Sequence, residues 1–168
     1  MSSEPGIKPH DIAAAEINCW RGRCLDLFAK AEAAVDLALR SAIERGMAAS
    51  MKHLTGQRLA EIVSLASSEA GATDRQKQAL IASLENWQAL YAKRNFFAHG
   101  VATVLMDRHG RWSVQLDFWV YRTGREILER WSWNNDEALQ FEADLEQCFK
   151  ALSAQLGCFR SRLAPQPR

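Results

Sequence analysis

The chain has 168 residues, of which 48% are hydrophobic and 24% are charged, and its 21 Lys and Arg residues nearly balance its 20 Asp and Glu residues. This length suits one domain with a substantial core, and the composition is that of an ordinary globular protein. A net charge of +1 argues neither for nor against a nucleic-acid partner. No apolar run approaches the ~20 residues of a membrane span, and residues 1–9 lack the apolar core of a signal peptide. We therefore expect a cytoplasmic protein with no membrane contact.

The cysteines do not form a metal-binding pattern. No two of them have CxxC spacing, and no histidines cluster beside them with the spacing of zinc ligands. They occur among apolar residues at helical positions, which indicates small buried hydrophobes in a reducing compartment. We predict neither a metal nor a cofactor. The cysteines are Cys19, Cys24, Cys148 and Cys158.

Two helices are predicted in the first part of the chain. Residues 12–45 are rich in strong helix formers, follow a plausible cap at Asp11 and repeat apolar residues at helical spacing. Gly22 either bends this helix or marks a close approach. A shorter helix is expected over residues 55–70 and ends at Gly71.

A third helix is predicted from a capping box at Thr73–Gln76 to a glycine stop at Gly100. Its apolar stripe consists of Leu80, Leu84, Trp87 and Tyr91. The same spacing places residues 94 and 98 next on this stripe. Ala98 fits a buried position, but Arg94 does not, because an isolated buried charge costs several kcal/mol. Arg94 must therefore be paired, hydrated or facing another subunit.

After the third helix the apolar period changes from helical to alternating. Residues 112–120 alternate apolar and polar side chains, which is typical of a strand, and residues 101–106 and 127–133 are expected as its neighbours. The connecting segments 107–110 and 122–125 each contain a glycine where a positive φ is needed. We predict an antiparallel meander.

The predicted fold class is mainly α. An up-down bundle of four long helices carries a three-stranded antiparallel β-meander, at about residues 101–133, inserted before the last helix. Asn134–Glu137 supplies a cap and an acidic first turn for that helix. We expect a single helical domain over residues 10–163, with flexible tails at 1–9 and 164–168.

The candidate catalytic residues lie at the end of the third helix, in Arg94-Asn95-Phe96-Phe97-Ala98-His99. Asn95 and His99 are four residues apart and share a helical face, and the long Arg94 side chain can curl to join them. Cleavage of RNA without a metal requires deprotonation of a 2′-hydroxyl, protonation of the departing 5′-oxygen and stabilisation of charge on phosphorus. His99 suits the proton transfers, Arg94 suits the charge, and Asn95 can orient the imidazole or the phosphate.

One imidazole cannot be base and acid in the same step, but two copies of the motif across a two-fold axis can share the roles. An isologous interface repeats each residue near its own axis. The sequence therefore predicts a homodimer in which Arg94, Asn95 and His99 meet their copies.

This motif resembles the HEPN superfamily, in which an arginine, commonly an asparagine or aspartate, and then a histidine occur near a helix end. The resemblance implies a dimeric up-down helical bundle and a metal-independent endoribonuclease with Arg94, Asn95 and His99 in its composite site. It also implies a toxin-antitoxin or phage-defence setting, with RNA as substrate and a cognate antitoxin as a possible partner. Other members are non-catalytic modules that bind RNA, nucleotide or a protein partner. Gly100 and Val101 follow His99, so the tyrosine of toxins that are silenced by adenylylation is missing.

The motif also has a structural interpretation. Arg94 can form a buried salt bridge with an acidic residue of the first helix, while Asn95 is exposed and His99 interacts with the helix dipole. Arginines at the predicted turns are candidates to guide an RNA backbone or are simply solvated. They are Arg108, Arg111, Arg122, Arg125 and Arg130.

The aromatic residues of the predicted sheet can either stack on bases or pack on the bundle, and we favour packing. The tryptophans concerned are Trp112, Trp119, Trp131 and Trp133. Phe96 and Phe97 are expected to pack and so fix the orientation of the motif.

Overall fold

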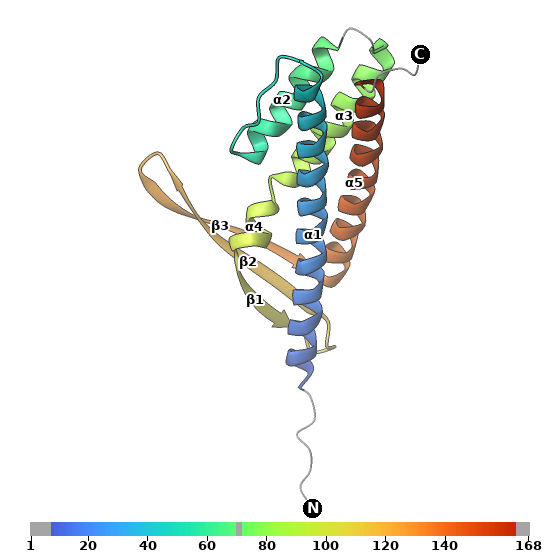
Figure 1. Ribbon diagram of the computed structural model, residues 1–168. Coiled ribbons are helices and arrows are strands. Elements are labelled where there is room, and N and C mark those ends of the chain that lie inside the picture. Colours follow the sequence, from blue (N-terminus) through green and yellow to red (C-terminus); the bar gives the residue numbers. More distant parts are fainter. Residues whose placement is uncertain (1–7, 70–71, 164–168) are drawn as a thin grey trace, which may run out of the picture. The chain divides into compact units, whose positions relative to one another are not determined.

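The computed structural model describes residues 8–69 and 72–163, which form five helices and one three-stranded antiparallel sheet (Figure 1). The described chain is mainly helical, as predicted. The elements are α1 (Pro9–Glu44), α2 (Thr55–Ser68), α3 (Asp74–Tyr91), α4 (Arg94–His99), β1 (Val101–Met106), β2 (Trp112–Arg122), β3 (Arg125–Asn134) and α5 (Asn135–Leu163). None of the described helices is both long enough and apolar enough to cross a lipid bilayer.

The chain divides into two compact units. Unit 1 contains Met1–Asp26 and Lys93–Asp144, and unit 2 contains Leu27–Ala92 and Leu145–Arg168. The helices α1 and α5 therefore contribute residues to both units, and the chain passes from unit 2 to unit 1 just before α4.

The first helix begins earlier than the sequence indicated. Pro9 is its first residue, a position that suits proline because no partner for its missing N–H is needed there. The Lys8 carbonyl accepts hydrogen bonds from the backbone N–H groups of Asp11 and Ile12, so Asp11 lies within the first turn rather than at the cap. The tail predicted at residues 1–9 is wrong at Pro9, which belongs to α1, and residues 1–7 lie outside the described residues. The tail predicted at residues 164–168 and the helix stop at Gly71 also lie outside them.

Unit 2 is helical and is built around aromatic side chains. Trp87 on α3 contacts Phe28 on α1 and Phe149 on α5, with ring centroids 5.7 and 6.4 Å apart. The capping box predicted at Thr73 and Gln76 is present at the start of α3. Leu80, Leu84 and Trp87 are buried, and Tyr91 packs edge-on against Phe28 with ring centroids 6.0 Å apart, so the apolar stripe predicted for α3 is confirmed.

One buried ion pair also belongs to unit 2. Arg162 on α5 donates to both carboxylate oxygens of Glu69, at 2.8 and 2.9 Å, and Glu69 is buried. The hydrogen bond to Glu69 raises the pKa of Arg162 above its usual value. Because the carboxylate accepts two charge-assisted bonds, its burial is compensated.

Unit 1 contains the sheet, whose strands lie in the order β1-β2-β3. The alternation predicted for residues 112–120 is confirmed at its start, where Trp112, Val114 and Leu116 are buried on one face, called the inner face below. Trp133 on β3 pairs with Val114 and also lies on this face. Trp20 on α1 packs against Trp112 and Trp133, with ring centroids 6.4 and 5.6 Å apart. Aromatic contacts therefore hold the inner face of the sheet against α1 within unit 1.

Strand β2 extends beyond the end of its pairing with β1. Strand β1 pairs with β2 only over Trp112–Asp117, whereas β3 pairs with β2 as far as Arg122. Residues 118–129 consequently form a two-stranded extension of the sheet, called the arm below (Figure 1). Its turn contains Thr123 and Gly124, both with positive φ, as in a tight hairpin.

Candidate functional site

The candidate motif occupies a short helix of its own. The sequence predicted one helix from Thr73 to Gly100, but α3 ends at Tyr91 and α4 begins at Arg94. The backbone N–H of Ala92 bonds to the Gln88 carbonyl at 3.2 Å, which closes the last turn of α3. Arg94 is therefore not on the buried stripe of α3, and that inference from the helical spacing was wrong.

The buried side of α4 is anchored by Phe97. This ring is fully buried and contacts Trp20, Trp133 and Phe141 with centroid distances of 5.1, 5.5 and 5.3 Å. Its contact with Phe141 is a parallel stack, with an interplanar angle of 12°. Edge and offset contacts of this kind stabilise aromatic clusters beyond simple area burial. The expectation that Phe97 packs is confirmed, and the packing fixes which side of α4 faces outward.

A second anchor is Phe96, which is also buried. Its ring meets Phe118 on β2 and Trp131 on β3 in edge contacts, with centroids 5.8 and 5.7 Å apart. Because Phe96 and Phe97 are adjacent in sequence but contact different groups of rings, they restrain rotation of α4 about its own axis.

The end of α4 is closely packed at Gly100. The backbone N–H of Gly100 bonds to the Phe96 carbonyl at 3.0 Å. A Cβ atom at this position would lie 2.4 Å from that carbonyl oxygen. The sequence correctly indicated a glycine stop, but φ is −69° here, so glycine is required by lack of space rather than by a left-handed conformation.

Three side chains of the motif lie at the surface to different degrees. Asn95 and His99 are exposed, and Arg94 is half-buried. The imidazole of His99 lies against the Phe118 ring, with centroids 6.1 Å apart and an interplanar angle of 27°. Since Asn95 and His99 are four residues apart on one helix, they share the outward face. Arg94 therefore keeps part of its surface accessible to solvent.

Two more cations lie beside α4. Arg21 on α1 is half-buried, and its Nε donates to the Phe97 carbonyl, near the negative end of α4. Lys93 immediately precedes α4, and its Nζ lies 4.1 Å from the centre of the Trp131 ring. Burial lowers the pKa of Arg21 and also that of Lys93. The two cations add positive potential next to the motif.

Sequence analysis did not identify Arg21 as a residue of the site. It lies 76 positions from Phe97, and nothing in the spacing of α1 separates it from the other arginines of that helix. Lys93 adjoins the motif, but its contact with Trp131 depends on the fold of the sheet and has no signal in the sequence.

Acidic residues of α1 are candidate partners of Arg94, and two of them, Glu16 and Asp36, have other contacts. Glu16 accepts a hydrogen bond from Trp112 Nε1 at 2.9 Å. Asp36 accepts two bonds from Arg58 Nη1, at 2.9 and 2.8 Å. Both carboxylates therefore have structural roles of their own.

The structure does not bring the turn arginines together. Arg108 and Arg111 lie at the β1–β2 turn, while Arg122 and Arg125 lie at the β2–β3 turn, at the opposite end of β2. Arg111 forms an ion pair with Asp107. Hydrogen bonds to Asp107, led by that from the Arg111 backbone, lower the pKa of its carboxyl.

Carboxylates also hold the arginines of the second hairpin. Arg122 pairs with Glu129 at 2.9 Å, and Arg130 pairs with Asp117 at 2.8 Å. Partial neutralisation of this kind weakens the attraction of a surface for phosphates. The turn arginines therefore do not form one basic path.

The tryptophans of the sheet divide into two groups. Trp112 and Trp133 are buried and Trp131 is half-buried, in agreement with the preference for packing. Trp119 differs, because 61% of its surface is exposed. It lies on the face of the sheet opposite Trp112, which is the polar side of the alternating pattern.

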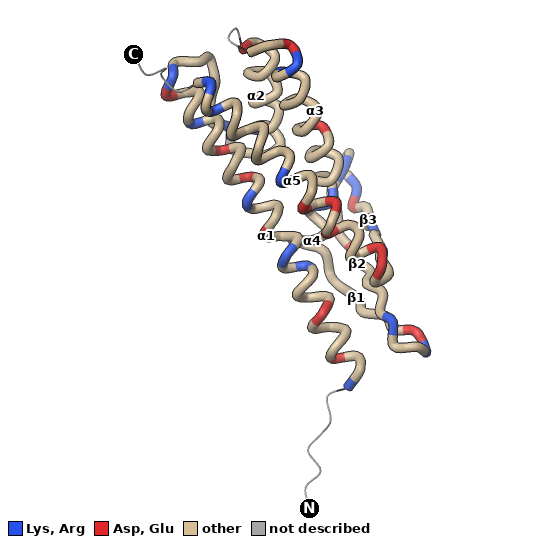
Figure 2. The backbone as a smooth tube through the Cα atoms, turned by 90° about the vertical axis from the view of Figure 1, so that its right-hand side faces the viewer, with Lys and Arg blue, Asp and Glu red and all other residues tan. Residues whose placement is uncertain are grey.

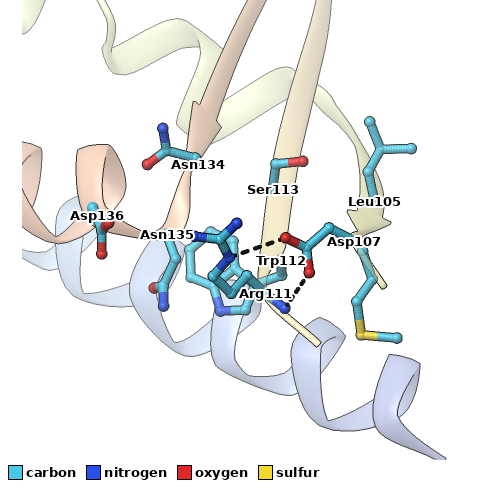
Figure 3. Close-up of a pocket in the computed structure, with 9 residues that line it drawn as sticks. Leu105, Asp107, Arg111, Trp112, Ser113, Asn134, Asn135 and Asp136 are labelled. Atoms are coloured by element: carbon cyan, nitrogen blue, oxygen red, sulfur yellow. Dashed lines mark hydrogen bonds and ion pairs between the residues drawn. The ribbon is translucent and has the colours of Figure 1, made fainter. Parts of the chain in front are cut away.

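Two hollows of unit 1 lie away from the motif. A pocket of about 380 Å³ lies between the β1–β2 turn and the start of α5, where Asp107 and Arg111 face Asn135 and Asp136 (Figure 3). Asp107 and Asp136 disfavour a phosphate there, because both carry negative charge. A second, mostly apolar groove of about 600 Å³ lies along α1 and includes Trp20, Trp112 and Leu139.

The cysteines are free thiols in different surroundings. Cys24 is buried and burial raises its pKa to about 12, whereas Cys19 and Cys158 are exposed. The prediction of small buried hydrophobes thus holds for Cys24 and is wrong for the two exposed residues. Within residues 8–69 and 72–163, no three His, Cys, Asp or Glu side chains are placed together to hold a metal ion.

Comparison with known proteins returned no relatives. No protein-family model matches the sequence, and neither the curated proteins nor the solved structures gave a significant match. The function must therefore be argued from the residues of α4 and their surroundings.

Proposed function

We propose that this protein is a homodimeric, metal-independent endoribonuclease of the HEPN type, with Arg94, Asn95 and His99 as its catalytic residues. The observation that carries the proposal is the presentation of the motif. Asn95 and His99 are exposed on one face of α4, while Phe97 holds the opposite side of the helix in an aromatic cluster. Rigid support with exposed functional groups is what a preorganised site needs.

The proposed reaction is an intramolecular transfer within RNA. One His99 removes the proton of the 2′-hydroxyl, the O2′–P bond forms and the P–O5′ bond breaks. The His99 of the second copy gives a proton to the departing 5′-oxygen. The products are a 2′,3′-cyclic phosphate and a 5′-hydroxyl end, and the cyclic phosphate can later open to a 3′-phosphate.

The remaining residues stabilise and orient. Arg94 lies against the non-bridging oxygens of the pentavalent phosphorus, where its fixed charge is most favourable. Asn95 donates or accepts a hydrogen bond that positions the phosphate or the imidazole. Arg21 and Lys93 raise the positive potential around this point, since both lie beside α4.

The proposal extends to the whole assembly. The helices would form an up-down bundle, and the paired motifs would meet at a two-fold interface. Such an enzyme would act on cellular or phage RNA in the cytoplasm, in a toxin-antitoxin or phage-defence setting, with a cognate antitoxin protein as its inhibitor.

A second candidate is a non-catalytic HEPN module that binds RNA, nucleotide or a protein partner. The ion pairs of Arg111, Arg122 and Arg130 favour it, because carboxylates already occupy these cations. Among these ligands, a protein partner agrees best with a surface on which both signs of charge alternate.

The two candidates are separated by incubating the purified protein with RNA in EDTA. We expect fragments with cyclic-phosphate or 3′-phosphate ends, and we expect His99→Ala to lower the rate by about 10²-fold or more. His109→Ala is the matched control, since His109 is an exposed histidine at the β1–β2 turn. Undiminished cleavage by His99→Ala would overturn the nuclease proposal. Binding of RNA without cleavage, equal in wild type and His99→Ala, would establish the second candidate.

A further inference from the structure

The arm has an open edge. From Phe118 to Arg122, β2 is paired with β3 on one side and has no strand on its other side among the described residues. The backbone N–H and C=O groups along such an edge can pair with another strand. A hairpin of two strands is also marginally stable alone, and a third strand would support it.

Large apolar side chains are exposed on both faces of the arm. On the outer face, 61% of Trp119 and 73% of Tyr121 are exposed, and Leu128 lies directly across from Trp119. On the inner face, 43% of Ile127 is exposed. Exposed aromatic residues are enriched at the centre of protein interfaces, where they are withdrawn from water.

The charges of the arm indicate what kind of molecule covers it. Residues 117–130, which are the arm and the residue pair at its base, contain three basic and three acidic side chains, and both signs occur along the hairpin (Figure 2). They are Asp117, Arg122, Arg125, Glu126, Glu129 and Arg130. A single-stranded nucleic acid would require an excess of positive charge. A neutral surface with both signs can instead complement its own copy across a two-fold axis.

The other edges of the sheet are less suited to this pairing. Four of the six charged residues belong to β3, and charged side chains along an edge strand oppose the addition of another strand. The outer edge of β1 is also uncharged, but β1 contains no aromatic side chain, whereas Trp119 and Tyr121 lie beside the edge of the arm. The free edge of β2 carries no charge before Arg122.

We propose that residues 118–122 of β2 pair antiparallel with the same residues of a second copy of this chain, so that two sheets become one of six strands. Its relevance to catalysis rests on the nuclease proposal, but the pairing itself does not. The strand that covers the open edge of β2 thus belongs to a second copy of the chain. The contact consists of backbone hydrogen bonds flanked by the side chains of Trp119 and Tyr121.

This pairing would complete the catalytic site. The two-fold axis of an antiparallel strand pair is perpendicular to the sheet, so the inner faces of both copies lie on the same side. Pairing of all five residues centres the axis on Val120 and leaves the two Phe118 residues about 14 Å apart along the strands, at ~3.4 Å per residue. His99 lies 6.1 Å from Phe118 between ring centres. Both imidazoles therefore lie on the same side of the joined sheet.

The first test is the mass of the full chain by size exclusion with light scattering. We expect twice the chain mass of 18.9 kDa for the wild type. The double variant Trp119→Lys, Tyr121→Lys places two charges beside the edge and should be monomeric, with an unchanged circular dichroism spectrum. Leu105→Lys is the matched control, because Leu105 is 51% exposed on β1, and it should remain dimeric. A monomeric wild type, a double variant that stays dimeric, or a dimer lost in Leu105→Lys would overturn the proposal.

A cross-linking test does not depend on the folding of the lysine variants. With Cys19 and Cys158 replaced by Ser, Val120→Cys should form an intermolecular disulfide under mild oxidation, because residue 120 faces its own copy. Leu105→Cys should not cross-link under the same conditions. If only Leu105→Cys cross-linked, the proposed pairing of residues 118–122 with their copies would be refuted.

The outcomes also distinguish this inference from the nuclease proposal. A dimer that cross-links at residue 120 but does not cut RNA would support the inference while the proposed function fails. A wild-type dimer that cuts RNA, does not cross-link at residue 120 and persists in the double variant would preserve the function and refute the inference.

Discussion

The substitution Gly100→Ala tests the packing that holds α4. The added Cβ would lie 2.4 Å from the Phe96 carbonyl oxygen, 3.3 Å from its carbon and 3.4 Å from Leu116 Cβ. The first of these contacts is with backbone, so no side-chain rotation can relieve it. Either α4 or the start of β1 must shift.

The size of the effect follows from three contributions. Overpacking of this kind costs about 1–3 kcal/mol. Loss of the hydrogen bond from the Gly100 N–H to Phe96 would add about 1 kcal/mol. The lower entropy of an unfolded chain with alanine offsets about 0.4–1 kcal/mol. We therefore expect a net destabilisation of about 1–3 kcal/mol, which lowers Tm by about 3–10 °C in a chain of this length.

The measurement is thermal unfolding by scanning calorimetry, with Gly22→Ala as the control. Gly22 lies inside α1, and a Cβ there meets no atom within 4 Å, so Gly22 does not mark a close approach. Alanine is favoured over glycine in a helix interior by about 1 kcal/mol, so this variant should be more stable than wild type. If Gly100→Ala were as stable as wild type, the reasoning about the end of α4 would be refuted.

Two further predictions concern buried side chains. Phe97→Ala should cost about 3–5 kcal/mol in urea unfolding, since a fully buried ring is removed from a cluster; a loss below about 1 kcal/mol would contradict that role. Iodoacetamide at pH 8 should label Cys19 and Cys158 and spare Cys24, because burial raises the pKa of Cys24 to about 12. Equal labelling of Cys24 in the folded protein would contradict this. Since the pKa is raised, the contribution of Cys24 to stability is present below pH 9.0 and is lost as the pH rises towards 12.

Local interactions made much of the fold predictable. The capping box at Thr73 and Gln76 and the alternation from Trp112 to Leu116 depend on neighbours in sequence, and both occur in the structure. The same alternation placed Trp119 on the polar side of β2, where it is exposed. The mainly helical composition and the order of the strands follow from patterns that involve residues only a few positions apart in sequence.

The candidate site was only partly predictable. Arg94, Asn95 and His99 were identified from their spacing, and Asn95 and His99 are exposed on one short helix, as the chemistry requires. Arg21 was not identified, because its bond to Phe97 joins residues 76 positions apart. No periodicity within one helix carries information about such a contact.

The sequence by itself determined the helices, the meander and the motif, since each depends on residues a few positions apart. The tertiary structure alone decided where the third helix breaks. Every residue from Asp74 to His99 is compatible with a helix, but the chain turns at Ala92 and Lys93, and Phe96 and Phe97 then enter the aromatic contacts of unit 1. Burial of those two rings outweighs the few hydrogen bonds that a continuous helix would keep. That break, and not the apolar stripe of α3, determines how His99 is presented.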